Sequence, residues 1–388
     1  MSRPLRAGIN AIFLEPGMGG LETYVIELVP ALVAAEPSLR LTLMCNARGR
    51  ELLERQPWAT SVEFRTPLAS RRGLRALYEV GPLGAYAGRH FDVLHSPALT
   101  APLATRAGNV VVLADTTWIS APDMGRGQAA TVRLWQSVVP PIARRADRVI
   151  AISEASAQDI ERHLRVPRER IDVIPLGYGS PRRVEPTPES TLRERLGLGG
   201  GPLLLNVGAK KVHKNQISAV RSLPRVREAV ADAVLVLAGA PTPYEAELRA
   251  EASRLGVEGA VAFPGYVDEP DLEGLYAAAA ALVFPSLNEG FGLPVLEAMA
   301  RGVPVVTSSL SSLPEVAGDA ALLVDPTSVD AIADATTRVL TDAALREHLV
   351  EAGLRRPAAF SWERTAAGTL ESWRRALGPR AARISWRR

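Results

Sequence analysis

The sequence contains a single cysteine and no long apolar run. Cys45 is the only cysteine among 388 residues, so no disulfide can form within the chain, and a reducing compartment is expected. No segment approaches the roughly 18 consecutive apolar residues of a membrane span. The apolar stretch near the N-terminus is interrupted by Glu15 and Pro16 before it reaches the length of a signal segment. We therefore expect a cytoplasmic protein that is not integral to a membrane.

A large excess of charge of one sign is also missing. The formal net charge is only +3, which argues against a surface built to bind nucleic acid. The sequence has no zinc-ligand spacing and no interleaving of aromatic and basic residues. It also has no pair of aspartates placed to hold a divalent ion on a diphosphate. We expect neither a nucleic-acid partner nor a metal.

The order of apolar segments predicts an α/β protein with two doubly wound, Rossmann-like domains. Short apolar runs alternate with helix-period segments nearly throughout, which is typical of parallel sheets covered on both faces. Residues 177–190 interrupt this series with glycine, serine and three prolines, and we interpret them as a linker. The predicted domains are residues 1–176 and 191–360, followed by a closing segment, 361–388. Two such domains are expected to face a ligand cleft.

The stretch "NEGFGLPVLEAMARGVPVV", residues 288–306, indicates a ligand site. The pattern predicts a strand, a glycine loop and a short helix, whose N-terminus attracts an anion such as phosphate. Glu289 and Glu297 would repel that anion, but carboxylates accept hydrogen bonds from the vicinal hydroxyls of sugars. This combination favours a sugar-nucleotide site. The simpler alternative is that Glu297 complements the helix dipole and Glu289 is a loop charge.

Two lysines of the segment "GAKKVHKN" are candidates to bind the diphosphate. Lys210 and Lys214 follow an apolar strand and precede a helix, so their ammonium groups could neutralise a departing diphosphate. Lysines in loops are more often solvated surface groups, and that alternative stays open.

The first domain offers further candidates at the ends of its predicted strands. Gly19 and Gly20 permit close approach of a ligand to the backbone, although a simple tight turn explains them almost as well. His95 and Asp115 each follow an apolar run, and we expect both to face the cleft. There they could bind a substrate hydroxyl or act as a base, or they could simply cap loops.

The C-terminal sixteen residues, "WRRALGPRAARISWRR", contain arginines, two tryptophans and no acidic residue. Such a segment could rest peripherally on an anionic membrane surface. A solvated tail or an exposed helix face is an equally good interpretation.

Taken together, these motifs resemble the GT-B-type glycosyltransferases of family four, which are retaining enzymes. The segment "PSLNEGFGLPVLEAMARGVPVVTS" is similar to the family's Glu-x7-Glu motif. The resemblance implies that Glu289 contacts hydroxyls of the donor sugar and that Glu297 contacts the ribose. It also implies that the backbone between the glutamates contacts the diphosphate, through Gly290, Phe291, Gly292 and Leu293.

The resemblance extends along the chain. "GAKKVHKN" is similar to the Gly-x-Arg-x-Pro-His-Lys-Asn pattern of mannosyltransferase-like members, with Lys210 in place of the arginine. Lys214 and Asn215 match that pattern, and Gly19 and Gly20 match the family's N-terminal glycine loop. The backbone near Val267 would meet the nucleobase. The resemblance also implies that residues 1–176 bind the acceptor and residues 191–360 bind the nucleotide sugar. The final helix, from "FSWERTA" onward, would cross back to the N-terminal domain.

One departure concerns Ala114, which stands where close relatives have a histidine near the transferred sugar. This difference bears on donor preference and rate. The resemblance implies a metal-independent transfer of a hexose or deoxyhexose from a nucleotide sugar to a hydroxyl acceptor, with GDP-mannose favoured over UDP and dTDP donors. The acceptor could be a glycan, a lipid-linked glycan or a natural product. Alternatives are an epimerase, a phosphorylase, or a degenerate subunit that binds nucleotide sugar and supports a partner transferase.

Overall fold

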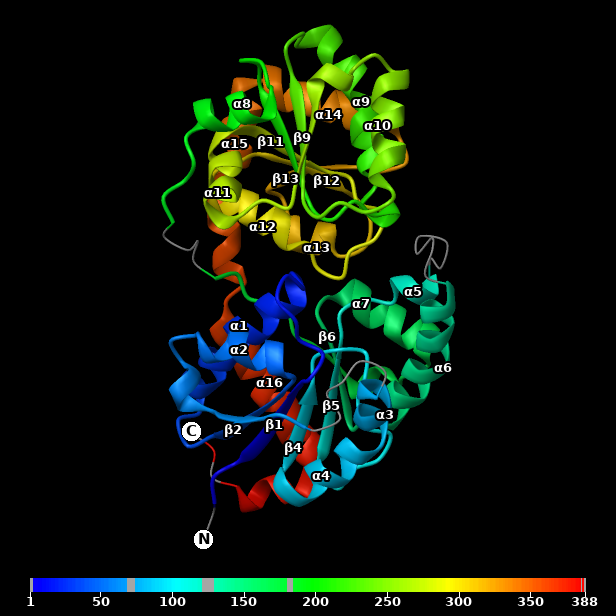
Figure 1. Cartoon of the computed structure of the whole chain (residues 1–388), viewed down its shortest axis with the longest axis vertical. Coiled ribbons are helices and arrows are strands. Elements are labelled where there is room, and N and C mark those ends of the chain that lie inside the picture. The colour runs from blue at the N-terminus through cyan, green and yellow to red at the C-terminus, as the bar shows by residue number, and fades with distance from the viewer. Residues whose placement is uncertain (1–2, 68–73, 121–128, 180–183, 385, 387–388) are drawn as a thin grey trace. The chain divides into compact units, whose positions relative to one another are not determined.

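The computed structural model describes residues 3–67, 74–120, 129–179, 184–384 and 386, and contacts divide the chain into two compact units (Figure 1). Unit 1 contains the described residues up to Gly179 and those from Phe360 onward. Unit 2 contains the described residues between them, ending at Ala359. The first boundary lies inside the predicted linker, 177–190, and the second lies one residue before the predicted closing segment.

Unit 1 is built on a seven-stranded parallel sheet with the order β3-β2-β1-β4-β5-β6-β7. Its strands are β1 (Arg6–Ala11), β2 (Arg40–Cys45), β3 (Glu63–Arg65), β4 (Val93–Ser96), β5 (Gly108–Leu113), β6 (Arg148–Ala151) and β7 (Ile171–Val173). Its α-helices are α1 (Gly20–Ala35), α2 (Ala47–Glu54), α3 (Arg75–Val80), α4 (Pro82–His90), α5 (Thr117–Ser120), α6 (Ala129–Arg145), α7 (Glu154–Asp159) and α16 (Trp362–Leu377). Continuous burial of β4 and β5 explains why these strands show no alternation of polar and apolar residues.

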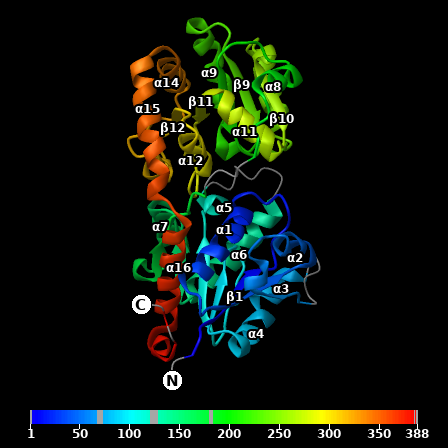
Figure 2. The same cartoon turned by 90° about the vertical axis from the view of Figure 1, so that its left-hand side faces the viewer.

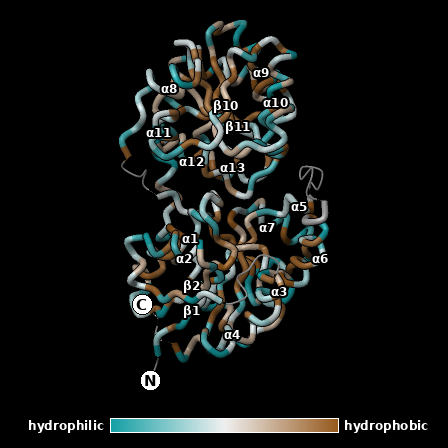
Figure 3. Tube along the Cα trace, viewed as in Figure 1, coloured by the Kyte–Doolittle hydropathy of each residue, from teal (hydrophilic) through white to brown (hydrophobic). Residues whose placement is uncertain are grey.

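Unit 2 is built on a six-stranded parallel sheet with the order β10-β9-β8-β11-β12-β13. Its strands are β8 (Leu203–Val207), β9 (Val234–Ala238), β10 (Val261–Gly265), β11 (Ala279–Phe284), β12 (Val305–Ser308) and β13 (Ala321–Val324). Its α-helices are α8 (Glu189–Leu196), α9 (Gln216–Ala229), α10 (Glu245–Arg254), α11 (Glu269–Ala278), α12 (Leu293–Ala300), α13 (Leu313–Ala317), α14 (Val329–Thr341) and α15 (Ala343–Arg355). Figure 3 shows hydrophobic residues concentrated along the central strands. The two sheets confirm the predicted fold class.

In both sheets the strand order reverses once, and each reversal defines a place for a ligand. The chain moves outward from β1 through β2 to β3, and then returns to the other side of β1 with β4. In unit 2 the same reversal separates β8 from β11. Connections on the two sides of such a point diverge at the carboxyl ends of the strands, and open α/β sheets bind ligands there.

The final helix, α16, belongs to unit 1, although the residues of unit 2 precede it in the sequence. It contacts α1 and the strands β4, β5 and β6, and Figure 2 shows it beside α1. Trp373 on this helix is completely buried, so it is not available for a membrane surface, contrary to one interpretation of the basic tail. Trp386 lies under the Arg374 guanidinium, 4.5 Å from the ring centroid, and donates to the carbonyl of Ala381.

A chain of buried hydrogen bonds fastens α16 to the rest of unit 1. The indole N–H of Trp373 donates to His95 Nδ1 over 3.2 Å, and His95 Nε2 lies 3.1 Å from the hydroxyl of Tyr24. Because an indole nitrogen can only donate, His95 Nδ1 must accept, and the Nε2–H must donate to Tyr24. Tyr24 then bonds to Thr369, whose hydroxyl donates to the carbonyl of Thr365. These contacts join β4, α1 and α16.

This arrangement corrects the placement expected for His95. The residue is completely buried inside β4, and both ring nitrogens bind protein groups. Burial lowers the pKa of His95 to about 3, because charging the ring would require a proton in an apolar interior. His95 therefore serves the packing of unit 1 as a neutral residue.

We predict that His95→Gln flattens the pH dependence of the stability of unit 1. The folded-state pKa of His95 lies below its unfolded value of about 6.5, so the unfolded state binds more protons between pH 6.5 and pH 3. The wild type should therefore lose stability as the pH falls through that range, by at most about 1.4 kcal/mol per pH unit from this group. The variant should lack this contribution.

Urea unfolding followed by tryptophan fluorescence is the appropriate measurement, because all six tryptophans belong to unit 1. His348→Gln, at an exposed position of α15 in unit 2, is the matched control and should leave the unit 1 profile unchanged. Identical pH profiles for wild type and His95→Gln would contradict the neutral, buried state of His95.

Candidate functional site

The loop between β11 and α12 has the predicted form of a strand, a glycine turn and a helix. The strand ends at Phe284, and α12 begins at Leu293, directly after Gly292. Gly292 has φ of 114°, and a Cβ atom at this position would lie 2.7 Å from Leu313 Cδ2. Both the backbone angle and the lack of space require glycine here.

Two serines that our sequence analysis did not identify hold this loop. The hydroxyl of Ser311 accepts from the N–H of Glu289 over 3.1 Å and lies 2.6 Å from the Glu289 carbonyl oxygen. The hydroxyl of Ser312 lies 2.9 Å from the carbonyl oxygen of Glu289 and 2.6 Å from that of Phe291. The run "SSLSSLPE" after β12 is the only sequence signal of this contact. The serines fix the backbone on both sides of Gly290.

Lys214 and Glu289 form a direct ion pair at the strand-order reversal of unit 2. Lys214 Nζ lies 2.6 Å from Glu289 Oε1 and 2.8 Å from Oε2. Only 19% of the lysine side chain and 9% of the glutamate side chain are exposed. The ammonium also lies 5.5 Å from the centroid of the Phe284 ring. The structure thus brings together two residues that the sequence analysis assigned to one ligand.

Glu297, on the second turn of α12, is held by an aromatic hydroxyl. The buried Tyr276 of α11 donates to Glu297 Oε2 over 2.8 Å. Burial raises the pKa of Glu297, and the Tyr276 hydroxyl and the Arg301 charge oppose that rise. Arg301 stacks over the Tyr276 ring at 4.7 Å and pairs with Glu273. Tyr276 and Arg301 were not identified from the sequence, because no motif links them to Glu297.

Asn215 holds backbone segments beside the site in place through its side-chain amide. It adopts a left-handed conformation with φ of 52° and begins helix α9. Its side-chain amide donates to the carbonyl of Pro285 over 3.0 Å and to that of Pro326 over 2.7 Å. Asn215 thereby ties the start of the glycine loop to the segment after β13. The structure shows a supporting role, and a contact with substrate stays a prediction.

Lys210 is buried, whereas Lys214 is partly exposed. The side chain of Lys210 is fully buried, and Nζ donates to the carbonyl of Gly239. Burial lowers the pKa of Lys210 to about 8, because the ammonium loses hydration there. A contact between Lys210 and a diphosphate would require the side chain to leave Gly239, and it too stays a prediction.

Val267 lies in the turn after β10, where the sheet meets α11. Gly265, two residues before Val267, has φ of 75°, and the carbonyl of Gly265 accepts from the N–H of Gly239. Tyr266 is the most exposed large apolar residue of this turn, with 73% of its surface accessible. Val267 is partly exposed, which is compatible with the predicted contact to a base.

In the glycine loop of unit 1, backbone N–H groups already bind a carboxylate of the protein itself. The carboxylate of Glu22 accepts from the N–H groups of Gly17, over 2.7 Å, and Met18, over 3.1 Å. Gly19 has φ of 62° and immediately precedes α1, which begins at Gly20; both glycines are exposed. The loop is therefore structured by Glu22, a residue that the sequence analysis did not consider.

Asp115 follows β5 and is partly exposed, and its Oδ1 accepts from the N–H of Thr117 over 3.0 Å. It lines a pocket of about 270 Å³ to which Met18 of the glycine loop and Leu21 of α1 also contribute. Of the predicted residues of unit 1, Asp115 lines this pocket, whereas Gly19 and Gly20 do not, and their contact with a ligand stays a prediction. His95 does not line the pocket either.

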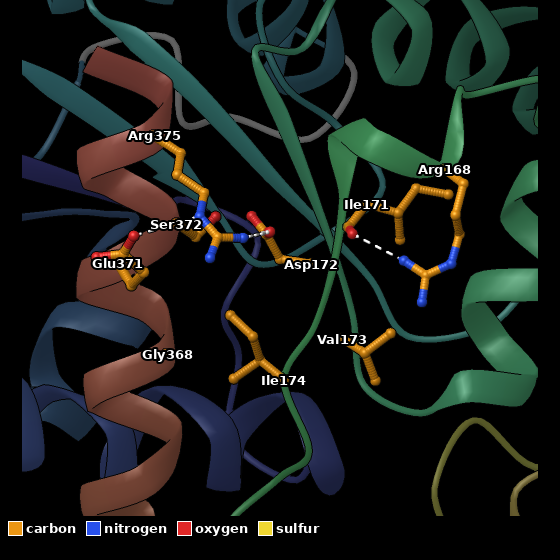
Figure 4. Close-up of a pocket in the computed structure, with 9 residues that line it drawn as sticks. All are labelled: Arg168, Ile171, Asp172, Val173, Ile174, Gly368, Glu371, Ser372 and Arg375. Atoms are coloured by element: carbon orange, nitrogen blue, oxygen red, sulfur yellow. Dashed lines mark hydrogen bonds and ion pairs between the residues drawn. The ribbon is translucent and has the colours of Figure 1, made fainter. Parts of the chain in front are cut away.

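A smaller pocket of about 220 Å³ lies between β7 and α16 (Figure 4). Its charged groups pair with protein partners: Arg375 bonds to Asp172 over 2.8 Å, and Arg168 donates to the carbonyl of Ile171 over 3.0 Å. Within the described parts of the chain, no three metal-ligating side chains gather into a cluster. None of the described helices has the length and apolar character needed to span a bilayer.

Two family models match the two units. Residues 18–178 match the model described as Glycosyltransferase Family 4, and residues 189–356 match Glycosyl transferases group 1. Each model covers less than half of the chain, but together they account for most of it. Both halves of the chain thus match glycosyltransferase domains.

Curated relatives carry related names. The O-antigen chain mannosyltransferase B of Escherichia coli is 36% identical over 232 residues, which span 58% of this chain and 60% of that protein. The MMP alpha-(1->4)-mannosyltransferase of Mycolicibacterium hassiacum is 32% identical over 65% of this chain and 60% of that protein. A D-inositol 3-phosphate glycosyltransferase of Salinispora arenicola is 27% identical over 99% of this chain. The chain thus matches about 60% of the length of the first two relatives.

Solved structures share the fold over nearly the whole chain. Anabaena HepE, in complex with UDP and glucose, has a TM-score of 0.73 at 22% identity and covers 95% of this chain and 100% of its own. WaaG, a glycosyltransferase involved in lipopolysaccharide biosynthesis, has a TM-score of 0.68 at 17% identity, with coverages of 95% and 99%. At these identities the likeness shows the fold alone, and that fold is GT-B.

We predict that Tyr276→Phe raises the pKa of Glu297 further. The hydroxyl of Tyr276 stabilises the ionised carboxylate of Glu297 and so lowers its pKa. Without this hydroxyl, the rise in the Glu297 pKa that burial causes is less opposed. Carbon-13 NMR of labelled glutamate carboxyl groups, with Glu297→Gln to assign the signal, measures this shift. Tyr266→Phe removes a hydroxyl from an exposed tyrosine of the same unit and serves as the control. An unchanged Glu297 titration in Tyr276→Phe would refute the positioning role.

Proposed function

We propose that this chain, which joins two glycosyltransferase domains in a GT-B fold, is a retaining glycosyltransferase. It transfers a hexose or deoxyhexose from a nucleotide diphosphate sugar to a hydroxyl acceptor, and GDP-mannose is the favoured donor. One observation carries the proposal: the Lys214–Glu289 pair and the Glu297 carboxylate flank a glycine loop fixed by serines at the strand-order reversal of unit 2.

The names of related proteins support the donor class. Two relatives at 36% and 32% identity are called mannosyltransferases, which favours mannose as the transferred sugar. The structural neighbour HepE was solved with UDP and with UDP-glucose, which supports a nucleotide sugar as donor. The acceptor hydroxyl could belong to a glycan, a lipid-linked glycan or a natural product.

The candidate residues of unit 2 would each contact a different part of the donor. Glu289 accepts hydrogen bonds from hydroxyls of the sugar, and its pairing with Lys214 holds the carboxylate in one orientation before the donor binds. Glu297, oriented by Tyr276, accepts from the ribose hydroxyls. The backbone from Gly290 to Leu293 and the positive end of α12 face the diphosphate.

Positive charge from lysine would stabilise the departing diphosphate. Lys214 lies beside the glycine loop and carries that charge already, whereas Lys210 would have to exchange the Gly239 carbonyl for a phosphate oxygen. In a retaining transfer the acceptor hydroxyl attacks from the side on which the phosphate leaves, so the leaving oxygen can take the proton. The proposed reaction therefore includes neither a metal nor a dedicated base.

The alternative is a degenerate subunit that binds nucleotide sugar without turnover. The intact pairing of Lys214 with Glu289 and of Tyr276 with Glu297 favours the enzyme. Contact with an anionic membrane surface stays a prediction that rests on the arginines of the C-terminal segment, since Trp373 is buried.

We predict that one nucleotide class stabilises the wild type and that Glu297→Gln loses most of the effect. A ligand at about 100 times its Kd stabilises a folded protein by roughly 2.7 kcal/mol, which a thermal shift detects. The panel contains GDP, UDP, dTDP and ADP with their common sugar conjugates. Glu315→Gln, at an exposed position of α13 in the same unit, is the matched control and should respond as the wild type does. If no nucleotide shifts the wild type, the sugar-nucleotide assignment of this site is refuted.

We further predict that turnover retains the anomeric configuration of the donor and continues in the presence of EDTA. Proton NMR of the anomeric signal, recorded at early times before mutarotation, distinguishes retention from inversion in the released or transferred sugar. A responding nucleotide sugar without slow hydrolysis or transfer would favour the degenerate subunit. An inverted product would contradict the retaining mechanism while leaving donor binding intact.

A further inference from the structure

The pocket of unit 1 lies where its strand order reverses. Its walls come from the segments that follow β1, β4 and β5 and from helices α3 and α6. Phe13, Leu21 and Leu99 line it together with Trp118 and Trp135. A volume of about 270 Å³ is sufficient for a small ring system, and most of the lining offers no hydrogen bond.

The polar groups around this pocket are largely occupied by one another. Thr100 donates to the buried carboxylate of Glu79 over 2.8 Å, and Arg75 Nε lies 3.6 Å from the same carboxylate. Arg75 also reaches the carbonyl of Phe13 at 3.5 Å. A sugar placed here would bury several hydroxyls with few partners, which is unfavourable. An apolar body would instead bury hydrocarbon against Trp118 and Trp135.

Two polar groups at the pocket could bind a single hydroxyl: the carboxylate of Asp115 as an acceptor, and the indole N–H of Trp118, which has no hydrogen-bond partner among the described residues, as a donor. Asp115 uses Oδ1 to accept from Thr117, and a carboxylate can accept several further hydrogen bonds. Ala114, beside it, also lines the pocket, and its side chain is only a methyl group. The pocket thus combines a largely apolar interior with a hydrogen-bond acceptor at the end of β5 and the indole N–H of Trp118.

Exposed leucines also occur in or next to the helices α3 and α6, which contribute to the pocket wall. Leu74 directly precedes Arg75, and Leu134 directly precedes Trp135; both leucines are more than half exposed, at 55% and 52%. Leu77, one turn along α3, is 69% exposed.

From these observations we propose that this pocket binds the apolar body of the acceptor, an alcohol or phenol whose hydroxyl bonds to Asp115. This inference rests on the proposed transferase function and narrows its acceptor to an apolar aglycone. A ring system and an isoprenoid chain share the required chemistry. A free glycan does not.

Titration calorimetry of the full chain tests the proposal with three probes. These are 2-naphthol as the ring compound, farnesol as the isoprenoid alcohol and methyl α-mannoside as the sugar. We expect at least one apolar alcohol to bind, with a negative heat-capacity change, and at least tenfold more tightly than the mannoside. Comparison of the first two probes identifies the source of the apolar body. A mannoside that binds as tightly as both alcohols would overturn the proposal, and so would the absence of alcohol binding.

Two substitutions locate the binding site. Ala98→Phe fills the pocket and should weaken the alcohol at least tenfold, whereas Ala34→Phe adds the same bulk on an exposed position of α1 and should not. An unchanged far-UV circular dichroism spectrum and an unchanged unfolding midpoint of Ala98→Phe would show that unit 1 still folds. If folded Ala98→Phe binds as the wild type does, the pocket is not the site and the proposal fails.

A third substitution tests the hydroxyl contact. Asp115→Asn should weaken 2-naphthol, or farnesol if that is the ligand, several-fold, but not the corresponding methyl ether, because the ether has no proton to donate. Equal effects on alcohol and ether would remove Asp115 from the proposal.

The nucleotide panel measures ligand binding to unit 2 independently. Nucleotide binding without alcohol binding refutes only the acceptor class, and alcohol binding without any nucleotide response refutes the transferase function.

Discussion

The reversal of strand order in each parallel sheet is the constraint on which the candidate sites depend. Parallel strands need crossover connections, and these pack onto the sheet with one handedness. When the chain returns from β3 to β4, or from β10 to β11, the connections on either side diverge at the carboxyl ends of the strands. The Lys214–Glu289 pair lies at this point in unit 2, and the apolar pocket lies at this point in unit 1.

The chemistry of the two units differs although their topology is the same. In unit 2 the carboxylates have polar partners before any ligand arrives: Lys214 for Glu289, and Tyr276 for Glu297. Such pairing orients the acceptor oxygens and lowers the cost of reorganisation when a sugar nucleotide binds. In unit 1 most of the pocket lining is apolar, and Thr100 and Arg75 beside it bond to Glu79. A polar donor in one unit and an apolar acceptor in the other would follow from this difference.

Unit 1 depends on a helix that the chain supplies last. The buried sequence of bonds from Trp373 through His95 to Tyr24 leaves no ring nitrogen of the histidine unsatisfied. A buried polar group without a partner costs about 1–3 kcal/mol, so α16 and β4 stabilise each other beyond their apolar contact. Because α16 follows unit 2 in the sequence, unit 1 has all of its elements only once the residues of unit 2 have been synthesised.

The sequence by itself determined the alternation of strands and helices, the glycine loop and the presence of Glu289 and Glu297 around it, because these follow from local periodicity and backbone conformation. Only the tertiary structure decided the partners. His95 is separated from Trp373 by 278 residues, and Glu289 from Lys214 by 75. Lys210, expected to bind the diphosphate, is buried against Gly239 after β9. Local patterns carry no information about such distant contacts, and these contacts determine which polar side chains are left for a ligand.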